Sequence, residues 1–318
     1  MGEFIAFISL LMFSLNVIVT KVASSRLDLN IGFLIAISVN VLFSGLLFLG
    51  LFYVNPHPLE FHWFGFFMFV LAGLFSTYLG RFMYFESIAK LGPSKASSFM
   101  VSNPLFTVII ASFLLGEMLS LIEFAAVLIV LLGLFLVSYI PQKSSKPVLQ
   151  AIGETEMAAT SMEMKSNRRK WREIFQPGVA LALFGSIAYA VGNITRGAGV
   201  QDWNEPILGG FIGAVIGLVL QLLFNKQART FIPSMRSADT KAVWLYAASG
   251  VLTISGQIGQ IASMRYIPVS IATLITMSQP LLVIPLSYFL LKNQEGLNAR
   301  IISGSLLVLF GIGTILLF

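Results

Sequence analysis

The 318-residue chain is 57% hydrophobic and only 11% charged, with a formal net charge of +6, and its mean hydropathy is +0.87. A soluble fold of this size could not keep so much apolar surface away from water, so the composition excludes a soluble globular domain. The chain has no cysteine, which excludes disulfides, thiolate catalysis and cysteine-ligated metal sites.

Apolar segments of about 20 residues alternate with short polar segments, as in helices that cross a hydrocarbon layer roughly 30 Å thick. We therefore predict an all-α membrane protein with ten transmembrane helices in two inverted five-helix repeats. The predicted spans are residues 3–23, 31–53, 63–88, 94–115, 121–139, 177–197, 205–225, 242–264, 269–291 and 298–318. The first span has no Lys or Arg before its apolar core, unlike a secretory signal, so we expect this helix to be retained.

A polar segment, residues 141–176, separates the first five predicted spans from the last five. Its composition cannot bury a core, so we predict that much of this cytoplasmic linker is disordered. The chain is thereby divided into a first five-helix repeat (residues 1–140), the linker (141–176) and a second five-helix repeat (177–318). Because each repeat has an odd number of spans, the second enters the bilayer from the opposite side, which makes the repeats inverted.

Two segments about 176 residues apart have similar sequences. Residues 94–117 read SKASSFMVSNPLFTVIIASFLLGE, and residues 270–292 read SIATLITMSQPLLVIPLSYFLLK. In both copies a side-chain amide directly precedes a proline. The equivalent pairs are Asn103 and Gln279, Pro104 and Pro280, Lys21 and Arg196 (within one residue), Gly80 and Gly256, Glu117 and Glu295, and Gly133 and Gly311. Such internal duplication is typical of secondary transporters.

Lys and Arg are unevenly distributed between the two predicted sides of the membrane, and the side richer in them faces the cytoplasm. Only Arg196 and Arg265 lie near span ends on the side of the chain termini, and Arg81 lies within a span. The linker side has 17 basic residues: Lys21, Arg26, Lys90, Lys95, Lys143, Lys146, Lys165, Arg168, Arg169, Lys170, Arg172, Lys226, Arg229, Arg236, Lys241, Lys292 and Arg300. We therefore predict a multi-pass protein of a bacterial or archaeal plasma membrane, with a cytoplasmic linker and both termini external.

The chain resembles the EamA-like branch of the drug/metabolite transporter superfamily over nearly its whole length, apart from the linker. The resemblance rests on the ten short spans in two repeats and on a small-residue run, a Pro-Leu step and a following Glu. These residues are Ala96, Pro104, Leu105 and Glu117, then Gly133; in the second copy Lys292 and Asn293 intervene before Glu295. The resemblance implies a secondary transporter that moves a small metabolite, such as an amino acid, an organic acid or a drug-like compound, often outward. It also implies cytoplasmic termini, opposite to what the charge distribution predicts.

Pro104 and Pro280 are predicted near the middle of their spans. A proline has no N–H for the carbonyl four residues earlier, and within a bilayer that carbonyl needs another partner. We predict that these helix breaks, together with Asn103 and Gln279, line a central substrate cavity. The alternative is a pair of kinks that pack against Ser or Thr side chains.

Arg81 lies inside the third predicted span, with Tyr84 on the same face. Their equivalents in the eighth span, Gln257 and Gln260, have the same three-residue spacing, so each pair forms one polar stripe. An intramembrane Arg usually faces the protein interior. We therefore predict that these four residues bind substrate and that Arg81 holds a carboxylate or phosphate. The alternative is that Arg81 snorkels to the linker-side membrane surface.

Other polar residues within the spans have two interpretations each. Glu86 could carry a coupling proton, but an ion pair with Lys90 one turn later is the interpretation we favour. Asn16, Asn40 and Asn193 are intramembrane amides that either contact substrate or join neighbouring helices.

We expect no cofactor, bound metal or nucleic-acid partner. The sequence has no nucleotide-binding loop, and its two histidines, His57 and His62, lie in one short loop. The cluster at residues 167–171 (NRRKW) is expected to contact anionic lipid headgroups. The predicted function is transport by alternating access, with proton coupling or exchange, in a monomer or homodimer. The alternative is a membrane-embedded enzyme or lipid-handling protein, for which the sequence offers no catalytic cluster.

Overall fold

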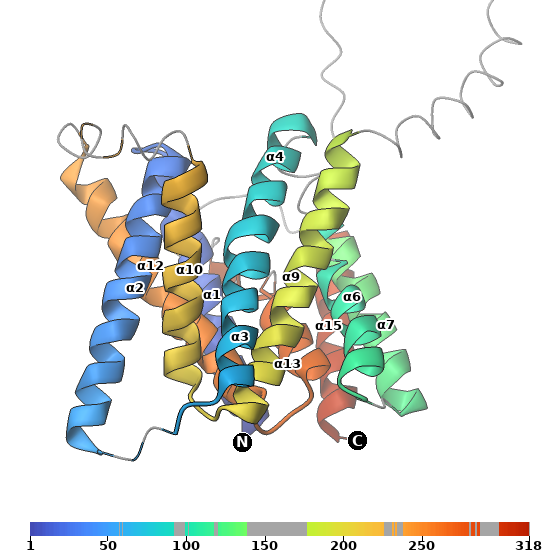
Figure 1. The fold of residues 1–318 in the computed structure, drawn as a ribbon. Helices are drawn as coiled ribbons and strands as arrows, with labels where there is room; N and C mark the ends of the chain where they lie inside the picture. Colours follow the sequence, from blue (N-terminus) through green and yellow to red (C-terminus); the bar gives the residue numbers. More distant parts are fainter. Residues whose placement is uncertain are drawn as a thin grey trace, which may run out of the picture.

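The structure is a computed structural model in which the described residues are 1–56, 58, 60–91, 99–100, 102–117, 120–138, 177–225, 231, 233, 238–279, 281–283, 285–286 and 299–317. The described elements form a bundle of helices (Figure 1). Their bounds are α1 Gly2–Ser24, α2 Leu29–Val54, α3 Trp63–Ala72, η1 Gly73–Gly80, α4 Arg81–Leu91, α6 Asn103–Leu114, α7 Leu121–Ser138, α9 Pro177–Asp202, α10 Pro206–Phe224, α12 Thr240–Ser263, α13 Val269–Met277 and α15 Ala299–Leu317. Met1 and the end of α15 lie at one end of the bundle, here called the terminal end, and α9 begins at the opposite, linker end.

Among the described residues, five helical segments are long and apolar enough to cross a membrane: α1, α2, residues Trp63–Tyr84, α9 and α10. Shorter apolar helices occupy Asn103–Leu114, Leu121–Leu136 and Ile302–Ile315, and α13 is also short and apolar. The multi-pass, all-helical prediction therefore agrees with the described residues, while the count of ten spans stays a prediction. The third span is one helical run in which η1 is a π-helix, a wider turn that is often found at functional sites.

Two carboxylates begin helices at the linker end. Asp28 accepts the backbone N–H groups of Asn30 and Ile31 at the start of α2. Asp239 accepts the N–H of Lys241 at the start of α12, and it also accepts Nη1 of Arg26 at 3.1 Å. The Lys241 N–H and, next, the Arg26 guanidinium lower the pKa of the Asp239 carboxyl, because both favour its charged form.

Helices from the two halves of the sequence pack against each other in a reciprocal pattern. The helix α1 packs along α12, and α9 packs along α3, η1 and α4. The ring of Phe13 in α1 lies against Gly256 of α12, and the ring of Tyr189 in α9 lies against Gly80 of η1. Gly256 and Tyr189 are 176 residues after Gly80 and Phe13, so the two contacts join equivalent positions.

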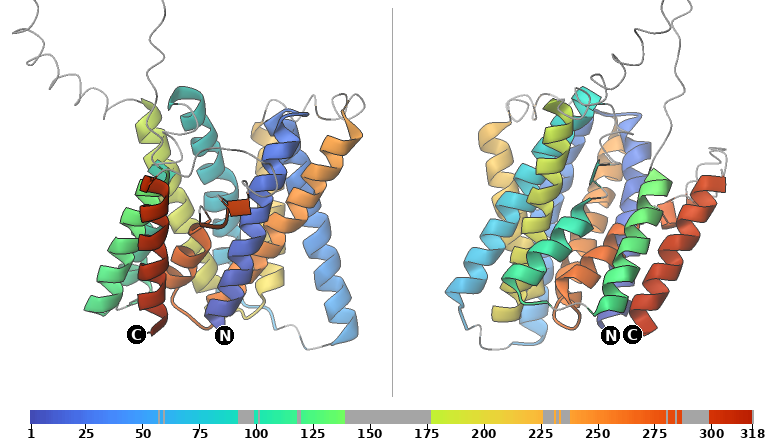
Figure 2. Two further views of the ribbon diagram at one scale, coloured as in Figure 1. Left: turned by 180° about the vertical axis from the view of Figure 1, so that it is seen from behind. Right: turned by 90° about the vertical axis from the view of Figure 1, so that its right-hand side faces the viewer.

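The interface between α7 and α15 is reciprocal in the same way, and the two helices lie together at one side of the bundle (Figure 2). A Cβ added to Gly133 would lie 2.6 Å from the carbonyl oxygen of Gly304, and a Cβ added to Gly311 would lie 2.9 Å from that of Ala126. Gly311 and Gly304 are 178 residues after Gly133 and Ala126. Only glycine allows the two backbones to come this close.

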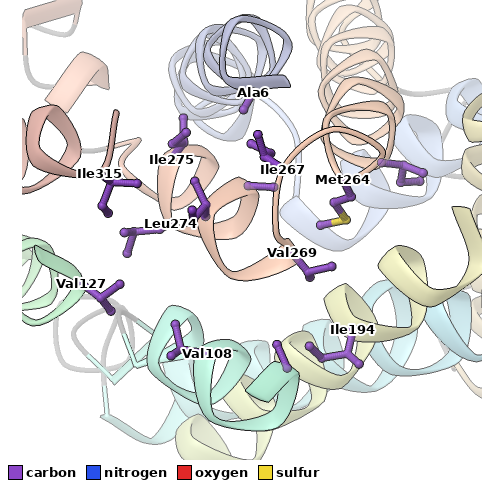
Figure 3. Packing of buried hydrophobic residues seen from close by; sticks show 14 of the residues in the cluster. Ala6, Val108, Val127, Ile194, Met264, Ile267, Val269, Leu274, Ile275 and Ile315 are labelled. Atoms are coloured by element: carbon purple, nitrogen blue, oxygen red, sulfur yellow. The ribbon is translucent and has the colours of Figure 1, made fainter. Parts of the chain in front are cut away.

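The larger buried apolar cluster is shared by both halves (Figure 3). It draws residues from near the terminal end, including Ala6 in α1, Trp203 after α9 and Met264 after α12. A second, smaller cluster of described residues is centred on Ala23 and Tyr246.

The helices that contain the two amide-proline pairs are interrupted. In the first half, α6 begins only at Asn103, with Pro104 in its first turn. In the second half, α13 ends at Met277, and the next helical residues are 281–283. The interruption at Pro104 agrees with the predicted helix break, because a proline in the first turn needs no intrahelical N–H and favours a helix start; its depth within the span stays a prediction. Pro280 lies outside the described residues.

Candidate solute-binding site

A stripe of polar side chains runs along one face of α9. Ser186, Tyr189, Asn193 and Arg196 are spaced three, four and three residues apart, which keeps them on one side of an α-helix. Asn193 is 2% exposed and Arg196 is 6% exposed, while Tyr189 is half-buried. These groups therefore face the interior of the bundle, as polar groups within a bilayer usually do.

The start of α6 lies against this stripe. The amide Nδ2 of Asn193 donates to Oδ1 of Asn103 at 3.3 Å, and the hydroxyl of Thr107 donates to the same oxygen at 3.1 Å. Two turns of α9 toward the linker end, the hydroxyls of Ser102 and Ser186 are 3.0 Å apart. The start of α6 thus places the polar side chains of Ser102, Asn103 and Thr107 beside α9.

Arg196 has only a neutral hydrogen-bond partner among the described residues. Its Nη1 donates to Oδ1 of Asn193 at 3.3 Å, and no carboxylate of a described residue lies within 4.0 Å of it. Tyr189 is within electrostatic range of Arg196 and also of Arg81. A buried guanidinium without a counter-charge is costly, so this arrangement favours an anionic ligand.

Arg81 begins α4, directly after the π-helix η1. Its Cζ lies 3.7 Å from the centre of the Phe33 ring of α2, which is a cation–π contact. The side chains of Arg81 and Tyr84 are half-buried. The preceding residue, Gly80, lies against the ring of Tyr189 of α9, so Arg81 lies close to both α2 and α9.

The equivalents of these residues in α12 make different contacts. Gln260 is 1% exposed, and its Nε2 donates to Oγ1 of Thr276 in α13 at 3.0 Å. Gln257 and Gln279 are half-buried. The structure thus brings Gln260 to α13, whereas Arg81 reaches α2 and approaches α9. Their membership of one substrate site stays a prediction.

The remaining candidates are placed as follows. Glu86 and Lys90 are both exposed, and no ion pair joins these two described residues, so both interpretations of Glu86 stay predictions. Oδ1 of Asn16 in α1 accepts the hydroxyl of Ser249 in α12. Asn40, with its amide oriented to donate, lies 2.7 Å from the carbonyl oxygen of Gly250. These two amides therefore join helices.

Glu117 connects the two halves at the terminal end. Its Oε1 accepts the N–H of Val269 at 2.6 Å, and its Oε2 accepts the N–H of Ser270 at 3.2 Å and its hydroxyl at 2.6 Å. A carboxylate from the loop after α6 therefore caps the first turn of α13, where the helix dipole favours a negative charge. Its sequence equivalent, Glu295, lies outside the described residues.

No metal centre is found in the described part of the chain, since its His, Asp and Glu side chains form no group of three that could bind an ion. Nδ1 of His62 lies 3.7 Å from Oδ2 of Asp202. His57 lies outside the described residues.

Sequence reasoning missed Arg196 as a site residue. It placed the end of the sixth span at residue 197 and therefore assigned Arg196 to the membrane surface. In the structure α9 continues to Asp202, so Arg196 lies more than a turn before the helix end and is buried. The three–four–three spacing of Ser186, Tyr189, Asn193 and Arg196 was the signal that could have identified the stripe.

Comparisons with known proteins agree with this architecture. The sequence model of the EamA-like transporter family matches residues 1–139 and 176–317. A solved structure titled "Crystal structure of protein" has a TM-score of 0.68 and 16% sequence identity, over 99% of this chain and 96% of the other. This likeness concerns the fold alone. No curated protein matches the chain.

Proposed function

Because the chain belongs to the EamA-like transporter family, we propose that this membrane transporter of small solutes works by alternating access between two inverted halves. The observation that carries the proposal is the reciprocal packing of α7 and α15, in which Gly133 meets Gly304 as Gly311 meets Ala126. Two related halves can exchange roles across such an interface, and inverted repeats commonly provide the inward-facing and outward-facing states of a carrier.

The described conformation fits a state that is closed at the terminal end. Support comes from Glu117, which ties the end of α6 to the start of α13. In the opposite state, the packing around the terminal end would loosen. The charge distribution supports a cytoplasmic linker end, where the basic linker would contact anionic headgroups.

The proposed substrate is a small metabolite with an anionic group, such as an amino acid or organic acid, and the proposed direction is efflux. Support comes from Arg81 and Arg196, two guanidinium groups in the bundle interior that approach the same tyrosine. The driving force would be a proton gradient or substrate exchange. The protein would act as a monomer or homodimer.

Counterflow in proteoliposomes tests the proposed mechanism. Vesicles containing the purified protein are loaded with a mixture of unlabelled amino acids and organic acids, and the uptake of each labelled solute is followed. In a carrier that alternates between two states, the step from the inward-facing to the outward-facing state is faster when substrate is bound. Uptake of the true labelled substrate should therefore be accelerated by internal substrate. Uptake that is equally fast in loaded and empty vesicles would indicate a channel and would contradict alternating access. Protein-free vesicles are the control.

A further inference from the structure

We propose that Arg196 and Asn193 of α9, together with the first turn of α6, form a subsite for the carboxylate or phosphate group of the transported solute. This subsite deepens the proposed transport function and rests on it. It differs from the site predicted from the sequence, which was centred on Arg81 and the glutamines of α12. The inference is carried by burial, by hydrogen-bonding capacity and by the asymmetry between the two halves.

The first observation is an excess of positive charge in the bundle interior. Arg196 is 6% exposed, and among the described residues only the neutral Asn193 accepts a hydrogen bond from it. A guanidinium group has five N–H donors in a planar fork, so several donors remain for another acceptor. Carboxylates and phosphates fit this fork with two parallel hydrogen bonds.

The second observation is the interruption before α6. The helix begins at Asn103 beside the α9 stripe, and Asn103 is 2% exposed. The first N–H groups of a helix have no intrahelical acceptor, and the helix dipole makes this end favourable for an anion. Arg196, connected to Asn103 through Asn193, independently indicates the same sign of charge. An anion held by Arg196 would lie beside Asn193 and the start of α6, where Asn193 contacts Asn103.

The third observation is that, among the described residues, α9 carries a buried cation at this position and α1 does not. The residues 176 positions before Ser186, Tyr189, Asn193 and Arg196 are Leu10, Phe13, Val17 and Thr20. The basic residue nearest to this position in the first half, Lys21, is exposed. Structural symmetry therefore gives no reason for a buried cation in α9, whereas a substrate that is itself asymmetric does.

Anion-dependent thermal stability of the purified protein tests the subsite. Melting temperatures are measured for the wild type, Arg196→Gln and the matched control Arg265→Gln, which changes an exposed Arg after α12. Acetate supplies a carboxylate, inorganic phosphate supplies a phosphate, and acetamide is the neutral control. Equal concentrations of chloride correct for ionic strength, because exposed charges also respond to salt.

Acetate or phosphate, but not acetamide, should raise the melting temperature of the wild type and of Arg265→Gln. The more effective anion identifies the substrate group. Since a hydrogen bond to a charged group contributes about 1.5–3 kcal/mol, Arg196→Gln should bind that anion about ten- to a hundredfold more weakly. An equal response in Arg196→Gln, or no anion response in the wild type, would overturn the subsite.

The stability of the unliganded variants separates binding from a structural role. Removal of an uncompensated buried charge should leave the melting temperature of Arg196→Gln unchanged or raise it. If Arg196→Gln unfolds and Arg196→Lys, which keeps the charge, does not restore the anion response, Arg196 serves packing and the proposal fails.

Failure of the subsite is distinguishable from failure of the transport function. Counterflow of an anionic solute with an unchanged KM in Arg196→Gln would refute the subsite and leave transport intact. An anion response that depends on Arg196, without transport of any solute by the wild type, would refute transport and leave the binding site.

Discussion

Glu117 offers a sharp test of how the two halves are held together. Three donors from the start of α13 reach its carboxylate: the N–H groups of Val269 and Ser270 and the hydroxyl of Ser270. In Glu117→Ala these donors lose their acceptor at a half-buried position. Loss of a helix cap costs about 1–2 kcal/mol, and hydrogen bonds to a charged group contribute about 1.5–3 kcal/mol each. Because water can hydrogen-bond to some of the donors that lose Glu117, we expect Glu117→Ala to lower the free energy of unfolding by about 2–4 kcal/mol.

The measurement is reversible unfolding of the purified protein in mixed micelles, followed by tryptophan fluorescence. Glu123→Ala is the matched control, because Glu123 accepts the N–H of Ser120 within its own helix start and is not connected to the other half. Its loss should cost about 1 kcal/mol. The reasoning is refuted if Glu117→Ala is no more destabilising than Glu123→Ala. Glu117→Gln keeps one carbonyl acceptor and should fall between the wild type and Glu117→Ala.

Three further predictions concern packing, orientation and the helix break. Gly311→Ala should destabilise the fold by about 1–3 kcal/mol in the same unfolding assay, since its Cβ would contact α7 in a packed interface. Gly313→Ala is the control, because its Cβ would have no neighbour within 4 Å. Equal effects of the two substitutions would contradict the reciprocal interface. In intact cells, an impermeant maleimide should label Asn204→Cys at the terminal end and not Ser25→Cys at the linker end, and the opposite pattern would reverse the predicted orientation. Pro104→Ala permits the helix to extend through the interruption, so transport should fall with little change in melting temperature; normal transport would make the proline incidental.

Gly2→Cys is unsuitable for the labelling test even though Gly2 is close to the chain start. Its added Cβ would lie 2.8 Å from side-chain atoms of Tyr266 and Ile267. Such a close contact would disturb the packing of α1 at the terminal end. This constraint is invisible in the sequence, because Gly2 and Ile267 meet only in the folded chain.

Membrane insertion and the family could be predicted from the sequence because both depend on local patterns. Apolar runs such as residues 31–53 follow from the thickness of the hydrocarbon layer. The equivalence of Gly133 and Gly311 followed from spacing alone, and the structure shows why both are glycine: each meets the backbone of the facing helix.

Site residues could not be predicted as well, because burial and pairing depend on which helices become neighbours. Arg81, a prominent intramembrane charge, lies on the Phe33 ring. Gln260 donates to Thr276. Arg196 was predicted at a span end, but α9 continues past it to Asp202. Sequence distance carries no information about these contacts.

The sequence by itself determined that the protein lies in a membrane, that it is helical and that it is internally duplicated, because hydropathy and residue spacing can be read along the chain. Only the tertiary structure decided that α6 begins at Asn103, that Glu117 caps a helix of the other half, and that Arg196 is buried beside Asn193. The physical reason is that hydrogen bonds and charge burial depend on positions in space. Helices such as α6, α9 and α13 define those positions only after they have packed together.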